Sequence, residues 1–215
     1  MKKPSWTLTD VAKIAAEHPY TFDRPSEKAI HNIQPGDHVK LVFSAKEAAK
    51  QQRVATPSAE RMWVLVSEND GQGNFKGKLD NDPVVIKDLT VGEGISFSAC
   101  HVASASSNNE PSIIEPYFRR CFVSNQILNN GAKATLIFRE ETANQKDSGW
   151  RILTNGEDET HVKTDHDNHF SFVSLGAVLN RDDSFVAHLS LPAGTRLEKA
   201  LNGIWPQPKK NISKP

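Results

Sequence analysis

The stretch that most constrains this chain is Asp147-Ser148-Gly149-Trp150-Arg151, followed after a short apolar run by Asn155-Gly156-Glu157-Asp158-Glu159. It combines a large aromatic side chain, a permanently charged guanidinium and a cluster of carboxylates within one expected strand and its turns. Because the large area of a tryptophan is usually mostly buried, we expect Trp150 to pack in a core or against a sheet. The motif predicts a rigid strand with charged side chains near its ends.

Charged residues of both signs gather around this strand. Residues 134–139 are rich in β-branched and aromatic residues, so they predict a strand, and residues 150–153 are its expected antiparallel neighbour. In that arrangement guanidinium–carboxylate bonds hold the connecting loop. Alternatively, the same charges form an exposed recognition surface on a rigid sheet. The residues concerned are Arg139, Glu140, Asp147, Arg151 and Glu157.

The Asp147–Arg151 motif, together with Gly156-Glu157-Asp158, resembles the signature of a bacterial domain family that is grouped with polymorphic-toxin immunity proteins. The resemblance covers residues 121 to about 200. It implies a non-catalytic protein-binding module whose partner is a toxin, and it implies no chemistry at these residues. It does not identify the target.

A small, polar segment without periodicity, residues 103–111, predicts a linker between two domains. We therefore expect an α+β protein with two small domains, each a bent antiparallel sheet with short helices. The expected boundaries are an N-terminal domain with a barrel-like sheet at 1–102, the linker at 103–111, an immunity-like domain at 112–205 and a flexible tail at 206–215.

In the N-terminal part, polar and apolar residues alternate from Asp37 onwards, which is typical of a half-buried strand. A turn-forming cluster at residues 69–73 predicts a hairpin between 61–66 and 75–79. Helices are expected at 9–18, with a cap at Thr7 or Thr9, and from Ser26. Further expected elements are strands at 84–86 and 95–98 and an inserted loop at 44–59 with a helical turn at 46–52.

Three separated segments of this part, 35–43, 60–64 and 77–83, resemble a second uncharacterised bacterial family over residues 20–102. Their pattern is PGD-x-VKL-x-F, then E-x-MWV, then G-x-LxNxP. The resemblance implies no enzymatic activity.

In the C-terminal part, we expect a strand at 121–124 and a helical turn at 125–130 that Gly131 closes. Residues 170–180 are apolar enough for a strand or a short helix, and residues 185–191 form another buried element. The chain is polar and proline-rich from Pro206, which predicts a frayed end.

Composition excludes several classes of protein. The chain has 26 basic and 26 acidic residues, divided as 13 and 13 in residues 1–102 and again in 103–215, so a global attraction to nucleic acid or an anionic membrane has no support. No apolar run is long enough to span a bilayer. A polar segment follows Met1-Lys2-Lys3 where a secretory signal would be apolar. We therefore expect a cytoplasmic protein with Cys100 and Cys121 reduced.

Two other functions compete with the protein-binding module. His161, His166 and His169, with Asp165 and Asp167 between them, are suitable ligands for zinc, manganese or iron, which would make the chain a metal-dependent enzyme. The N-terminal sheet is the alternative site, where Trp63 beside Arg61 and Lys76 can stack on a nucleobase or hold a small ligand. No serine or cysteine has the neighbours of a catalytic nucleophile. We expect no cofactor, and the oligomeric state stays open.

Charge is segregated locally although it cancels globally. Residues 156–168 are acidic and the chain from Arg196 onwards is basic, so an acidic loop can meet a basic toxin surface and accelerate association. A solvated loop with no partner is the alternative. The candidate binding residues are therefore Trp150, Arg151, Glu157, Asp158, Glu159, Asp165 and Asp167.

Overall fold

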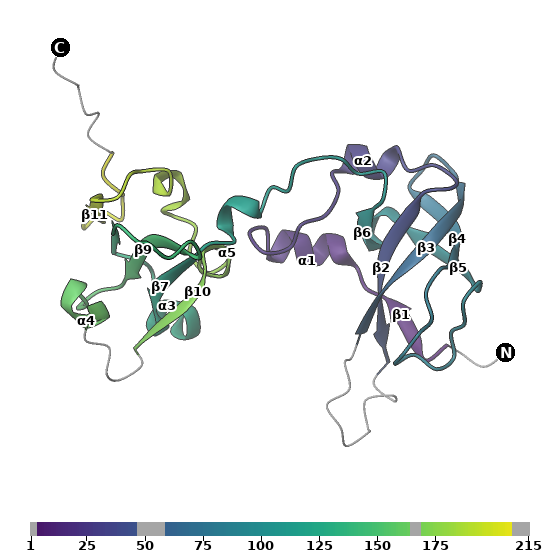
Figure 1. Ribbon diagram of the computed structural model, residues 1–215, viewed down its shortest axis with the longest axis horizontal. Coiled ribbons are helices and arrows are strands. Elements are labelled where there is room, and N and C mark those ends of the chain that lie inside the picture. The colour runs from purple at the N-terminus through teal and green to yellow at the C-terminus, as the bar shows by residue number, and fades with distance from the viewer. Residues whose placement is uncertain (1–3, 47–58, 164–168, 208–215) are drawn as a thin grey trace, which may run out of the picture. The chain divides into compact units, whose positions relative to one another are not determined.

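The computed structural model describes residues 4–46, 59–163 and 169–207 of the 215-residue chain. The chain divides into two compact units (Figure 1). The first comprises residues 1–18 and 22–112, and the second comprises residues 113–215 together with residues 19–21. Each unit has its own sheet and its own hydrophobic core, which is the α+β class that the sequence predicts. The predicted domain boundaries stay a prediction.

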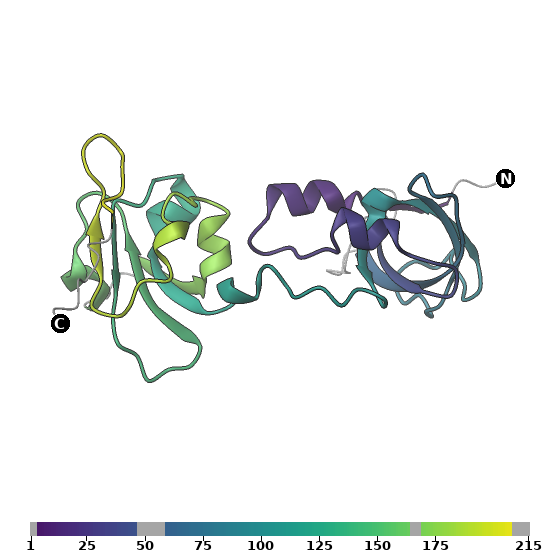
Figure 2. The same cartoon turned by 90° about the horizontal axis from the view of Figure 1, so that it is seen from above.

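In its described residues, 4–46 and 59–112, the first unit has a single antiparallel sheet and two short α-helices. The strands run in the order β1-β2-β3-β4-β5, and β6 also pairs with β2. Because β1 and β6 pair with opposite ends of β2, and β6 follows β5 after one 3-10 turn, the sheet curls round on itself (Figure 2). The elements are β1 Trp6–Leu8, α1 Val11–Glu17, α2 Glu27–His31, β2 His38–Ala45, β3 Ala59–Asn69, β4 Asn74–Leu79, β5 Gly94–Ser98, η2 Ala99–His101 and β6 Val102–Ala105.

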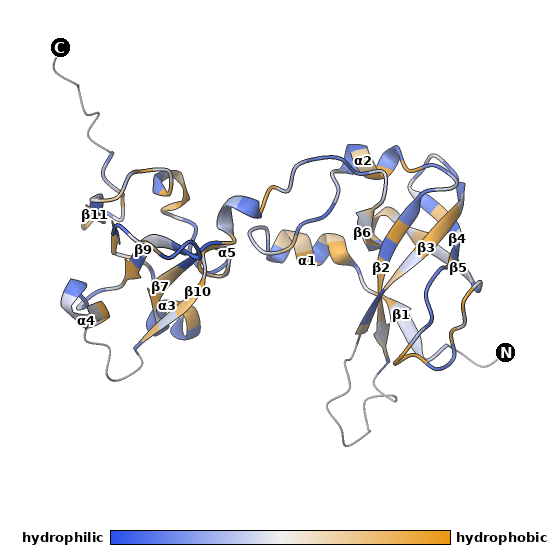
Figure 3. Ribbon diagram, viewed as in Figure 1, coloured by the Kyte–Doolittle hydropathy of each residue, from blue (hydrophilic) through white to orange (hydrophobic). Residues whose placement is uncertain are grey.

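Alternation along the strands builds the core of this unit. Val39, Leu41 and Phe43 of β2 are fully buried, and β3 and β4 repeat the pattern with every second residue facing inward. Figure 3 shows the same alternation of hydrophobic and hydrophilic residues along β2 and β3. The predicted hairpin between β3 and β4 is confirmed, because the turn residues and the period of two act together.

Both predicted N-terminal helices are present, and their caps are local. The side chain of Ser26 accepts a hydrogen bond from the N–H of Ala29 and caps α2 as predicted. The cap of α1 is Asp10, which accepts from the N–H of Lys13. Thr9 is not the cap because its hydroxyl lies 2.6 Å from that of Ser44 in β2. The predicted cap at Thr7 or Thr9 is therefore wrong by at least one residue.

The predicted strand at residues 84–86 is wrong. The backbone N–H groups of Val84, Val85 and Ile86 donate to the carboxylate of Glu60 and not to a neighbouring strand, and Val84 is 73% exposed. Trp6–Leu8 forms a strand that the sequence did not predict, paired with the end of β2. The predicted helical turn at 46–52 lies almost wholly outside the described residues.

The predicted linker at 103–111 begins inside the sheet. Residues 103–105 belong to β6, where Val102 and Ala105 are buried, since small side chains fit a closely packed strand. Beyond it, Ser107 donates to Asp37, and Glu110 accepts hydrogen bonds from Ser26. The segment is therefore bonded to the first unit up to Glu110 and is not a free spacer.

The second unit is a five-stranded mixed sheet in the order β10-β7-β9-β8-β11. Three of the four ladders, β10–β7, β9–β8 and β8–β11, are antiparallel, but β7 and β9 are parallel. The prediction of a wholly antiparallel sheet is therefore wrong here. A parallel pair needs a long crossover, and α3 and β8 supply it. The elements are η3 Glu115–Tyr117, β7 Arg120–Ser124, α3 Asn125–Asn130, β8 Leu136–Arg139, β9 Asp147–Leu153, α4 Glu159–Lys163, β10 Phe170–Ser174, α5 Leu175–Leu179, η4 Val186–His188 and β11 Arg196–Glu198.

The sheet of the second unit has a hydrophobic cluster on each face. Successive side chains of a strand point to opposite faces, so Trp150 and Ile152 join one cluster with α3 and α5, while Leu153 joins a smaller one with Phe138 and Phe170. The predicted pairing of β8 with β9 and the closure of α3 by Gly131, at φ 73°, are confirmed. No helix in the described part of the chain is long and apolar enough to cross a membrane.

Candidate functional site

The site begins with a bulge in β9. Arg120 and Phe122 of β7 are two residues apart, yet they lie opposite Asp147 and Arg151 of β9, which are four residues apart. Two extra residues, Ser148 and Gly149, are therefore inserted in β9. A regular strand rises about 3.3 Å per residue, so residues four apart would be about 13 Å apart. The bulge brings Asp147 and Arg151 to roughly half that distance from each other, because their partners on β7 are only two residues apart.

Gly149 makes this bulge possible. Its φ of 83° lies in the left-handed region, and a Cβ at this position would come 2.3 Å from the carbonyl oxygen of Glu140. The Gly149 carbonyl in turn accepts a hydrogen bond of 2.9 Å from the N–H of Glu140. Only glycine satisfies both the torsion and the close approach of the end of β8.

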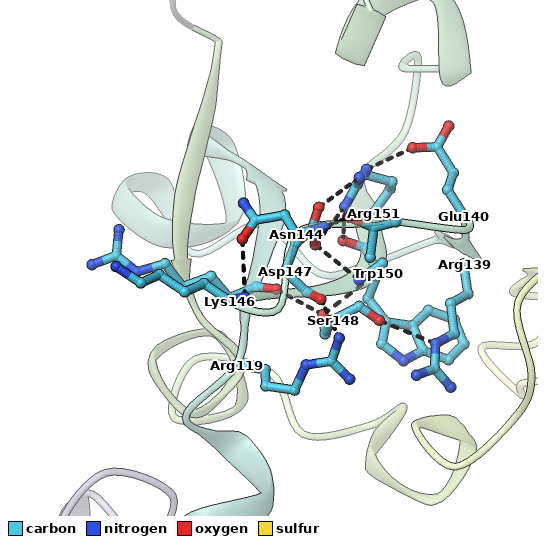
Figure 4. Close-up of polar contacts among 12 residues, drawn as sticks. Arg119, Arg139, Glu140, Asn144, Lys146, Asp147, Ser148, Trp150 and Arg151 are labelled. Atoms are coloured by element: carbon cyan, nitrogen blue, oxygen red, sulfur yellow. Dashed lines mark hydrogen bonds and ion pairs between the residues drawn. The ribbon is translucent and has the colours of Figure 1, made fainter.

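The bulge brings Asp147 and Arg151 into a buried, bidentate ion pair. The two terminal nitrogens of the Arg151 guanidinium, Nη1 and Nη2, donate to Asp147 Oδ1 at 3.1 Å and Oδ2 at 3.0 Å. The third nitrogen, Nε, donates to Glu140 at 2.9 Å (Figure 4). Burial alone lowers the pKa of Arg151, but the bonds and charges of Asp147 and Glu140 outweigh it, and the net shift is upward. This confirms the predicted role of these three residues in holding the loop.

Trp150 lies on the opposite face and is 1% exposed. Its indole N–H donates to the carbonyl of Leu189, so the prediction of a core tryptophan is confirmed. Arg139 was expected to pair with a carboxylate, but its guanidinium donates to the backbone carbonyls of Ser148 and Leu191. The strand register explains this difference, because Arg139 lies opposite Trp150 and not opposite Arg151.

The acidic segment is partly used inside the unit. Glu157 accepts hydrogen bonds from the hydroxyl of Ser124 at 2.7 Å and from the N–H of Thr154 at 2.9 Å, and Glu159 pairs with Arg196 at 2.6 Å. Among the described contacts, Glu157 therefore pairs with neither Arg139 nor Arg151. Asp158 accepts hydrogen bonds from Thr160 at the start of α4. Asp165 and Asp167 lie outside the described residues.

The predicted metal ligands are only partly described. His169 is exposed, His166 lies outside the described residues, and so does the side chain of His161. Within residues 4–46, 59–163 and 169–207 no group of three histidine, cysteine or acidic side chains is placed to hold a metal ion. The metal site at these histidines stays a prediction.

The other candidate groups have structural contacts. Burial raises the pKa of the Cys121 thiol, which keeps it in the protonated and unreactive form. On the N-terminal sheet, Lys76 pairs with Glu68 at 2.7 Å. The ammonium of Lys40 covers the ring of Trp63 at 4.3 Å, and Arg61 lies over the ring of Phe22. The nucleobase-binding role of this face stays a prediction.

A cleft of about 290 Å³ lies beside the bulge on the Trp150 face. Arg119, Arg139, Ser148 and Ser190 contribute its polar groups, and Trp150 and Leu189 are among its apolar ones. Sequence reasoning missed Arg119. The sequence signal for Arg119 is the pair Arg119-Arg120 directly before the expected strand at 121–124. Side chains alternate along a strand, so the two guanidinium groups must point to opposite faces of the sheet.

Fold and site together define the second unit as a small α+β unit in which the charged motif secures a bulged central strand. Residues 121–209 match the family model of the Immunity protein Imm33 domain. The match covers less than half of the chain and no part of the first unit. This segment is therefore similar to an immunity-protein domain, as the sequence resemblance implied.

Comparison of the chain with curated proteins finds no match, and neither does comparison with solved structures.

Proposed function

We propose that this protein is an immunity protein, a non-catalytic module that acts in the cytoplasm and neutralises a toxin protein by binding it. The observation that carries the proposal is the similarity of residues 121–209 to the Immunity protein Imm33 domain. That segment contains most of the second unit, including β9 and both hydrophobic clusters.

The contacts of the motif support this proposal. Asp147, Arg151 and Glu140 bind one another, and Glu157 binds Ser124 and Thr154. Charged groups that satisfy each other in this way rigidify a scaffold and are poorly placed for proton transfer to a substrate. A rigid scaffold with exposed loops suits recognition of a protein, because little conformational entropy is lost on binding.

The test uses the full chain and the toxin candidates encoded beside its gene. Each candidate is expressed in a sensitive host with and without this protein, and binding of the two purified proteins is measured by calorimetry. We expect one candidate to be lethal alone, harmless in the presence of this protein and bound at about 1:1. If the protein rescues growth without binding the toxin, for example by consuming its product, the non-catalytic proposal is wrong.

The predicted acidic recognition loop needs its own measurement. Glu157 and Glu159 bind Ser124, Thr154 and Arg196 in other elements of the unit, and replacing them would alter the fold, so the prediction is tested at Asp158, Asp165 and Asp167. Neutralising these three residues should slow association with the toxin at low salt and flatten its salt dependence, because complementary charge mainly accelerates encounter.

A further inference from the structure

The cleft beside the β9 bulge is lined by two arginines, Arg119 and Arg139. Among the described contacts, Arg119 donates to the carbonyl of Asp147, and Arg139 donates to the carbonyls of Ser148 and Leu191. Neither forms an ion pair with a described carboxylate, whereas Arg151 binds two. Figure 4 shows Arg119 and Arg139 on the Trp150 side of the strand, away from Arg151 and Glu140.

Both guanidinium groups are held in place before any ligand arrives. A guanidinium has five N–H donors, and the bonds to backbone carbonyls use only part of that capacity. Cζ of Arg139 lies 5.7 Å from the centroid of the Trp150 ring, which further restricts the side chain. Donors that are ordered in advance lose little entropy on binding, so they favour an anionic ligand with planar oxygens, such as a carboxylate.

Apart from Ser148, Ser190 and Tyr117, the rest of the cleft is apolar. Trp150 and Leu175 are buried, and Val186 and Leu189 are partly buried around the same opening. An apolar wall reduces solvent screening of the charges, so an ion pair formed here is stronger than one on an open surface. The matching ligand has a negative charge next to an apolar group.

The size of the cleft narrows the class of ligand further. Pockets for small molecules and cofactors span roughly 300–1,000 Å³, and about 290 Å³ lies at the lower limit of that range. A dinucleotide cofactor is too large for complete burial here. One side chain and part of its neighbour fit.

We propose that this cleft takes an aspartate or glutamate side chain, flanked by an apolar residue, from the surface of the partner protein. The proposal rests on the immunity function proposed above and names the chemistry of one contact. Arg119 and Arg139 bind the carboxylate, and the partly buried side chains of Val186 and Leu189 receive the apolar neighbour. Ser148 is already bonded to Arg120 and the N–H of Trp150, so it positions the strand and does not bind the ligand.

Arg119 is the residue to change. Arg139 is less suitable because it also donates to the carbonyl of Leu191, so its replacement would disturb the contact between β8 and that segment. Arg120 is the matched control. It is adjacent and exposed and has the same charge, but its guanidinium lies over the ring of Phe172 and is not part of the cleft. Both arginines are exposed and each donates to one backbone carbonyl, Asp147 for Arg119 and Phe172 for Arg120. Arg119→Gln and Arg120→Gln therefore change the net charge equally, but only Arg119→Gln alters the cleft.

The first measurement uses the ¹⁵N-labelled full chain and two blocked peptides, acetyl-Leu-Glu-Leu-amide and acetyl-Leu-Gln-Leu-amide, at up to about 10 mM, a range suited to contacts worth about 4 kcal/mol or less. We expect the glutamate peptide to shift the indole resonance of Trp150 while those of Trp6 and Trp63 in the first unit stay in place. The shift should vanish in Arg119→Gln and persist in Arg120→Gln. No shift, an equal shift with the glutamine peptide, or a shift that survives Arg119→Gln would overturn the proposal.

The second measurement uses the toxin identified by the rescue experiment. Arg119→Glu should weaken binding by roughly tenfold or more, and Arg120→Glu by less than about threefold, since the loss of a desolvated charge contact exceeds that of a peripheral one. If wild type and Arg119→Glu bind the toxin equally well, the cleft proposal fails and the immunity function stands. If wild type binds none of the candidates, the immunity function itself fails.

Discussion

The N–H of Glu140 donates a 2.9 Å hydrogen bond to the carbonyl oxygen of Gly149. The carbonyl oxygen of Glu140 lies 2.3 Å from the position that a Cβ on Gly149 would take. The residue that follows β8 therefore packs directly against the β9 bulge. This contact sets the geometry of the buried ion pair on one face and of the cleft on the other.

Gly149→Ala should therefore destabilise the protein more than an ordinary glycine substitution. Gly156 has the same φ of 83°, but no atom lies within 4 Å of the position that an added Cβ would take, so it is a matched control. Backbone strain alone should cost Gly156→Ala about 1–2 kcal/mol, and the clash should cost Gly149→Ala about 1–3 kcal/mol more. The check is urea denaturation of both variants, and equal losses would show that the bulge relaxes without penalty.

Asp147→Ala should cost about 3–5 kcal/mol, because it leaves the guanidinium of Arg151 buried with one partner fewer. The Lys76–Glu68 pair, with both side chains 62% exposed, is the control, and Glu68→Ala should cost less than about 1 kcal/mol. The double variant Asp147→Leu with Arg151→Met should recover part of the loss, since it removes both charges. Chemical denaturation measures all of these, and a double variant less stable than Asp147→Ala would contradict the explanation.

Trp150→Ala should cost about 3–5 kcal/mol, as large-to-small changes in cores do. The indole is almost fully buried between the sheet and the segment that contains Leu189. Trp63, which is only partly buried and covered by Lys40, provides the comparison, and Trp63→Ala should cost less. An unchanged denaturation midpoint for Trp150→Ala would show that the indole is exposed in solution.

The first unit should lose stability in mild acid through His101. Burial lowers the pKa of His101, with a smaller opposing effect of Asp10, and Nδ1 accepts a 3.0 Å hydrogen bond from the N–H of Ser98. The unfolded chain therefore binds a proton more readily than the folded one. The contribution is complete above the unfolded pKa of about 6.5 and is lost as the pH falls from there towards the lower folded pKa.

His101→Asn is the control for this effect, because its side-chain oxygen can accept the same bond and does not titrate near neutrality. Thermal unfolding between about pH 7.5 and about pH 5 should show a steeper loss in wild type than in the variant. Parallel curves for the two proteins would assign the acid sensitivity to other groups.

Local patterns in the sequence were enough to predict much of the fold. The turn at residues 69–73, the Ser26 cap, the closure of α3 by Gly131 and the pairing of 134–139 with 150–153 all depend on neighbouring residues or on a simple period. Short-range hydrogen bonds and side-chain alternation encode such features directly. The burial of Trp150 follows in the same way from its size and its place in a strand.

Other features depended on which distant segments meet. Val84–Ile86 reads as a strand by composition, but the Glu60 carboxylate takes its N–H groups. In the parallel pairing of β7 with β9, two extra residues of β9 lie between the partners of Arg120 and Phe122. No periodicity within β9 predicts this insertion. Long-range pairing decides between partners of similar local propensity, so the tertiary structure alone determines it.

The charged residues show the same division. The motif by itself determined that Arg151 would be held by nearby acids, because the carboxylates of Asp147 and Glu140 are close in sequence and in space. It did not determine that Arg139 would bind backbone carbonyls, or that Arg119 would join it in a cleft. Those outcomes depend on the face of the sheet to which each side chain points, and the register of β7, β8 and β9 sets that face only once the sheet has formed.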